Sequence, residues 1–158
     1  MNIKVLLLGG IVGYLLQFVV SMVTGPLIHE GVLVEAYIQN AVFWRPELNQ
    51  VPPDMAALMP RWVTVGLIAS CLFAQLFLWL RPAFSGSFWI QGVKYGLVLS
   101  LVIVLAMGGW SGIFNLPDTI WIWWAIETPF YYVVAGIAYA FIGAKLAPPA
   151  GAGHDAAM

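Results

Sequence analysis

Long apolar segments alternate with short polar ones along this chain, and four of the apolar segments have the length of a membrane-spanning helix. They cover residues 3–23, 62–80, 88–107 and 120–144. An α-helix rises about 1.5 Å per residue, so about 20 apolar residues cross the hydrocarbon core of a bilayer. The pattern therefore predicts an all-α membrane protein, a four-transmembrane-helix bundle. We expect one transmembrane domain over residues 1–146 and a disordered cytoplasmic tail over 147–158.

The connection between the first two spans, residues 24–61, is longer than the other connections and unusually apolar for a loop. Its polar residues do not gather on one helical face, which argues against a simple amphipathic surface helix. We therefore predict a long ordered outer loop between the first and second helices. It should contain a short helix that lies on the bilayer or against the bundle.

Composition supports membrane insertion and excludes several functions. The 158 residues are 62% hydrophobic and only 8% charged, with a mean hydropathy of +0.92, values that soluble domains do not reach. Six Lys and Arg in total leave no basic face for nucleic acid. The single cysteine, Cys71, excludes an intrachain disulfide and CxxC metal sites. Lys4 precedes the first apolar segment, but no A-x-A-like cleavage site follows, so we interpret that segment as a retained span.

The distribution of basic residues predicts the orientation, because Lys and Arg near span ends stay on the cytoplasmic side. Four of the six fall on one side of the predicted bundle and two on the other: Lys4, Arg81, Lys94 and Lys145 against Arg45 and Arg61. We therefore expect both termini to be cytoplasmic, with the protein in a bacterial inner membrane.

Glu127 is the polar residue that most needs an explanation, since it lies about 10 Å into the fourth span. An ionised carboxylate there costs several kcal/mol unless it is paired or protonated. Residues at the same depth in the other spans complete a predicted intramembrane polar layer: Gln17, Ser70, Cys71 and Ser100. In this prediction a protonated Glu127 donates a hydrogen bond to the side-chain carbonyl of Gln17.

Two interpretations of Glu127 stay open. In the functional one, the carboxyl is a site for a proton or a cation, as intramembrane acids often are. In the structural one, it is a hydrogen-bonded residue that locks the helix register. The predicted spans offer no second acid or base as a partner, which favours the structural interpretation.

His29, Glu30 and Glu35 are weak candidates for a metal site at the outer end of the first span. A metal needs three or four ligands at favourable spacing, and neither H-E-x-x-H nor repeated Glu-x-x-His is present. We therefore expect solvated loop charges here and predict no cofactor. The other histidine, His154, is in the predicted tail on the opposite side, so a haem held by two histidines of one chain is excluded.

Small residues four positions apart occur in three of the spans, as in Gly9-x-x-x-Gly13, Gly92-x-x-x-Gly96 and the region around Gly136. Such spacing lets helix backbones approach closely.

Three classes of function remain. A non-catalytic accessory or scaffold subunit of a membrane assembly suits the scarcity of charged residues best. An oligomeric transporter or channel that uses Glu127 as a proton or cation site is the alternative. A membrane enzyme or redox helper with a metal near His29 is the third. The expected partners are the lipid bilayer and either other membrane subunits or further copies of this chain.

Overall fold

The computed structural model of the chain describes residues 2–50 and 52–148, and within these ranges it contains helices and no strand. Four helices are long and apolar enough to cross a membrane. They are α1 (Ile3–Leu27), α3 (Met55–Leu80), α4 (Phe88–Ser111) and α5 (Asp118–Leu146). The predicted all-helical fold with four such helices is confirmed. The predicted tail falls mainly on residues 149–158, which lie outside the described residues.

Every one of these helices is longer than the apolar segment that predicted it. The clearest case is α3, which begins at Met55 and not near residue 62. The Asp54 side chain accepts a hydrogen bond from the backbone N–H of Ala57 and so caps the helix. Pro60 lies inside the helix, near enough to its start that few intrahelical bonds are lost.

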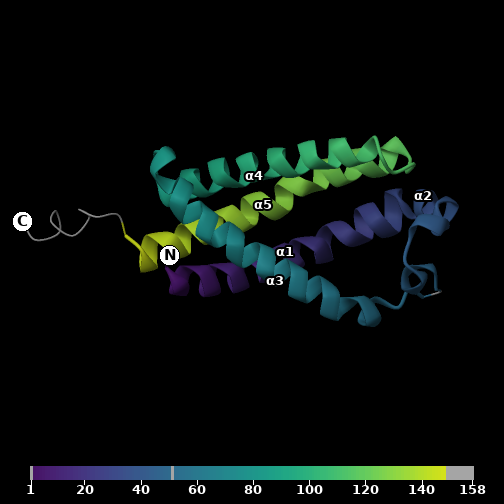
Figure 1. The fold of residues 1–158 in the computed structure, drawn as a ribbon, viewed down its shortest axis with the longest axis horizontal. Coiled ribbons are helices and arrows are strands. Elements are labelled where there is room, and N and C mark those ends of the chain that lie inside the picture. The colour runs from purple at the N-terminus through teal and green to yellow at the C-terminus, as the bar shows by residue number, and fades with distance from the viewer. Residues whose placement is uncertain (1, 51, 149–158) are drawn as a thin grey trace, which may run out of the picture.

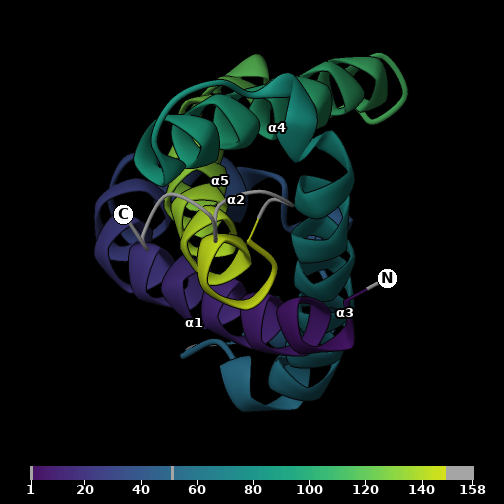
Figure 2. The same ribbon diagram turned by 90° about the vertical axis from the view of Figure 1, so that its left-hand side faces the viewer.

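Helix α5 is the central helix of the bundle (Figures 1 and 2). It packs against α4 on one side, against α1 on the other, and against α3 over a smaller region. Figure 1 shows α4 and α5 side by side along their length, whereas α3 crosses the bundle obliquely. The described N-terminal residues lie close to the C-terminal end of α5, where the Asn2 side chain donates to the carbonyl of Leu146.

Glycines form the seam between α4 and α5. A Cβ atom added to Gly92 would lie 2.5 Å from the Cα of Ile137, and one added to Gly96 would lie 2.5 Å from the Cα of Val133. A Cβ on Gly136 would meet the carbonyl oxygen of Gly92. The two backbones therefore touch directly, as the spacing of these small residues predicted.

The chain between α1 and α3 is largely helical. A π-helical segment (Ile28–Val32) continues α1, and α2 (Val34–Gln39) follows it. Two 3₁₀ segments, Ala41–Phe43 and Pro46–Asn49, come next. Ile28 and Leu33 are buried against Ile120 at the start of α5. This contact fixes the end of α1 and the start of α2 against the central helix.

We predict that Gly96→Ala lowers the free energy of unfolding by about 1–3 kcal/mol, because the added methyl group must push α4 away from α5. The measurement is reversible unfolding in mixed detergent micelles. The matched control is Gly109→Ala in the same helix, where a Cβ would meet nothing within 4 Å. Equal effects of the two substitutions would contradict direct contact between the backbones of α4 and α5 at Gly96.

Candidate functional site

Glu127 lies in the first half of α5 and is buried, with 4% of its surface exposed. Its Oε1 atom accepts hydrogen bonds from the hydroxyl groups of Thr24 and Tyr131, the latter at 2.7 Å. Its Oε2 atom is 3.0 Å from Nε2 of His29. An ionised carboxylate only accepts hydrogen bonds, and these partners supply three of them. The arrangement is therefore that of a buried carboxylate stabilised by donors from α1, its π-helical continuation and α5.

The π-helical segment positions His29. In this segment the backbone N–H of Leu33 donates to the carbonyl of Ile28 at 2.8 Å, five residues earlier. Ile28 and Leu33 are buried, with 8% and 0% of their surface exposed. His29 is held between these two anchors and reaches Glu127 on α5. Such π-helical turns occur frequently at functional sites.

The second ring nitrogen of His29 is also occupied, because Nδ1 lies 2.7 Å from the hydroxyl of Tyr37 on α2. The indole N–H of Trp124 donates to the same hydroxyl at 2.9 Å. One arrangement of protons satisfies the whole chain of contacts. Tyr37 donates to Nδ1, and the Nε2–H of a neutral His29 then donates to the carboxylate of Glu127.

Tyr37 keeps its proton at neutral pH. Burial raises the pKa of its hydroxyl above the ordinary value. The hydrogen bond from Trp124 lowers that pKa, and the negative charge of Glu127 raises it. The net direction is upward, so the phenol remains a donor for His29.

The histidine and the carboxylate together can take up one proton. With His29 neutral the pair carries a charge of −1, and with His29 protonated it is an ion pair with no net charge. In the protonated state both ring nitrogens are donors, so Nδ1–H donates to the Tyr37 oxygen and the Tyr37 hydroxyl hydrogen points elsewhere. The side chain of His29 is 35% exposed and that of Glu127 is 5% exposed.

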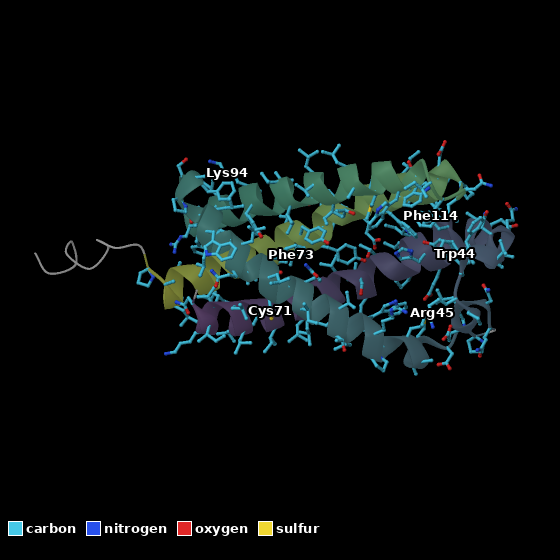
Figure 3. All side chains as sticks on the ribbon, viewed as in Figure 1. Trp44, Arg45, Cys71, Phe73, Lys94 and Phe114 are labelled. Atoms are coloured by element: carbon cyan, nitrogen blue, oxygen red, sulfur yellow. The ribbon has the colours of Figure 1, made fainter. Side chains whose placement is uncertain are left out.

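A cavity of about 280 Å³ lies beside the pair and is open to the outside. Its walls come from α1, α4 and α5, and its lining includes Gln17, Met107, Trp124, Thr128 and Tyr132. A second cavity of about 270 Å³ shares Met107 and Trp124 with the first. Phe114 lines the second cavity, and the centroid of the Trp44 ring lies 6.3 Å from that of Trp124. Figure 3 labels Trp44 and Phe114 at the opposite end of the bundle from Lys94.

Gln17 lies in the same cavity as Glu127, but the predicted hydrogen bond between them is not formed. The nitrogen of its side-chain amide is buried and has no partner within the described part of the chain. Thr24 takes the position opposite the acid, because it lies seven residues further along α1, about 10 Å. Glu127 is therefore bonded as a carboxylate and does not act as the protonated donor that we expected.

The other residues of the predicted polar layer lie in different surroundings. Ser70 donates to the carbonyl of Gly10 at 2.8 Å and lies 2.7 Å from the hydroxyl of Tyr139. Tyr139 follows Glu127 by twelve residues, about 18 Å along α5. Cys71 packs against Gly10. Ser100 donates to the carbonyl of Gly96 in its own helix at 2.7 Å.

The three weak metal candidates are not brought together. Both ring nitrogens of His29 have other partners, Glu35 accepts a hydrogen bond from Gln39, and Glu30 is exposed. Across residues 2–50 and 52–148 no three His, Cys, Asp or Glu side chains form a group that could hold a metal. His29 is also not the solvated loop residue that we expected. Helical structure continues past residue 23 and carries it to Glu127.

No family model matches the chain, and neither the curated proteins nor the solved structures with which it was compared include a match.

A double-mutant cycle tests the central contact. We predict that His29→Gln and Glu127→Gln are non-additive by about 0.5–3 kcal/mol in the free energy of unfolding, because each removes a partner of the other. The control cycle combines His29→Gln with Glu35→Gln, whose carboxylate is bonded to Gln39. Those two effects should add to within about 0.5 kcal/mol, and additivity in both cycles would refute the pairing.

Proposed function

We propose that this protein is a small membrane transporter in which His29 and Glu127 form the proton-binding site. The observation that supports it is the 3.0 Å contact between His29 Nε2 and Glu127 Oε2 beside an open cavity. A buried acid with a titratable partner is the arrangement expected of a proton site inside a membrane.

The surface of the bundle supports membrane insertion. Large apolar side chains are exposed on all four long helices, for example Leu15, Val65, Leu101, Ile122 and Phe130. In water such a surface would be unfavourable, whereas in lipid it faces hydrocarbon chains. We also propose that both termini are cytoplasmic and that the membrane is a bacterial inner membrane. Only the distribution of Lys and Arg supports this part of the proposal.

The pairing favours the transporter over the scaffold. A residue that only locks helix register needs no titratable partner and no adjoining cavity, and Glu127 has both. The accessory-subunit hypothesis remains a prediction, and it expects Glu127→Gln to be without consequence for ion movement. A single four-helix bundle encloses little space for a pore, so the proposal includes a symmetric homo-oligomer.

We predict that the purified full-length protein moves protons when it is reconstituted into vesicles that contain a pH-sensitive dye. The driving force is a potassium diffusion potential set with valinomycin. Glu127→Gln should reduce the flux to that of empty vesicles, because the amide removes the negative charge that stabilises the proton on His29. Glu35→Gln is the matched control, since this carboxylate is exposed on α2, and it should leave the flux unchanged.

Equal flux through the native protein and Glu127→Gln would reject the transporter. Flux no higher than in empty vesicles, both without added cation and with a gradient of benzyltrimethylammonium, would reject it as well, and light scattering of the detergent-solubilised native complex would then test the scaffold. Infrared spectroscopy gives an independent readout of the site. Lowering the pH should add a protonated-carboxyl or imidazolium band in the native protein that Glu127→Gln alters.

A further inference from the structure

We propose that the cavity beside Glu127 binds a lipophilic organic cation, an ammonium group attached to an aromatic or branched apolar body. The cation would exchange with the proton of the His29–Glu127 pair. This inference rests on the proposed function, because it uses the same pair, and it names the class of the second ligand.

The first argument is charge. When His29 is neutral, the site keeps one negative charge inside an apolar bundle, which is costly unless a cation compensates it. No Lys or Arg is among the described residues that line either cavity. Arg45 is bonded to Glu47 at 3.1 Å. A proton on His29 can supply the missing charge, and so can a cation in the cavity.

The second argument is that one carboxylate oxygen of Glu127 has fewer hydrogen-bond donors than the other. Glu127 Oε1 already accepts from Thr24 and Tyr131, whereas Oε2 has His29 as its partner. Oε2 thus has fewer donors around it than Oε1, and its negative charge can attract an ammonium group whether or not that group carries an N–H. Glu127 lines the cavity, which places this oxygen next to the space where a ligand fits.

The third argument is the chemistry of the walls. Aromatic side chains from the end of α4, the connection after it and the start of α5 line the second cavity, namely Trp110, Phe114, Trp121 and Trp124. Aromatic faces attract cations and also contact apolar groups. Trp124 and Met107 border both cavities. A ligand whose charged group lies near Glu127 can therefore rest its apolar body against Trp124 and Met107.

Exchange with the proton follows from the surroundings of the pair. The titratable groups in contact with it are Tyr37 from α2 and Tyr131 from α5, and neither is a base. From α1 it meets Thr24, while α4 faces the cavity with Ile103 and Met107. His29 is thus the group whose protonation cancels the negative charge. A bound ammonium disfavours that proton, and lower pH weakens cation binding.

The test is equilibrium dialysis of labelled benzyltrimethylammonium against the full-length protein in a neutral detergent. Its neutral isostere, neopentylbenzene, has the same shape without the charge. We expect saturable binding of the ammonium and at least tenfold weaker competition by the isostere. Between pH 8 and pH 5 the affinity should fall, by at most tenfold per pH unit for competition with one proton.

Glu127→Gln should weaken ammonium binding at least tenfold, and Glu35→Gln should leave it unchanged. Circular dichroism and elution volume establish that each variant is folded. The isostere and pH experiments use the native protein, so a folding defect in Glu127→Gln does not affect them. Absence of binding, equal competition by the isostere, or affinity independent of pH would overturn the inference. Glu127-dependent proton flux without ammonium binding would reject this inference and leave the proposed function intact.

Discussion

The burial of one carboxylate dictates much of the arrangement around it. Glu127 sits on the helix that contacts all three other long helices, so its hydrogen-bond donors must come from α5 itself and from helices packed against it. Thr24 and His29 supply them from α1 and its continuation, and Tyr131 from α5. Without these donors an ionised group buried in this bundle would be several kcal/mol less stable. The end of α1 is therefore held to α5 by polar contacts as well as by the packing of Ile28 and Leu33.

The two faces of α5 make different kinds of contact. On the α4 side, glycines bring the two backbones into contact. On the α1 side lie the acid and the donors that α1 and its continuation supply. Tight packing on one face makes α5 a fixed support for the acid. On the other face, His29 and its partner Tyr37 come from the π-helical segment and α2.

Length and hydropathy were sufficient to predict the four helices, because both properties are read residue by residue. The number of residues from the end of each predicted span gave the depth of its polar residues, and this identified Glu127 as the unusual one. The partners of Glu127 were harder to find, since His29 is 98 residues away and Thr24 is 103 residues away in sequence. We ended the first span at residue 23, although Leu27 and Ile28 continue the apolar pattern after an interruption by Thr24, Gly25 and Pro26. That boundary placed His29 in a loop.

Depth counting failed for the polar layer because it gives the height of a residue but not its direction around the helix. Ser100 has the right depth, yet its hydroxyl bonds to Gly96 of the same helix. For Ser70 the height itself was wrong, because α3 begins at Met55 and not near residue 62, and Ser70 lies beside Tyr139, about 18 Å along α5 from the acid. The rotation of each helix is set by close contacts such as those of the glycines. A single sequence does not reveal which glycine meets which neighbour.

The π-helical segment sets how α2 is rotated relative to α1. Its i→i+5 hydrogen bonds include one more residue per turn than the i→i+4 bonds of an α-helix. Each residue in an α-helix turns the chain by about 100°. A one-residue deletion within 28–32 that restored regular α-helix would therefore rotate all that follows relative to α1. Leu33 would leave its pocket beside Ile120, and Tyr37 would turn away from His29. The contacts from Tyr37 to His29 and from His29 to Glu127 therefore depend on the number of residues in this short segment as well as on their identity.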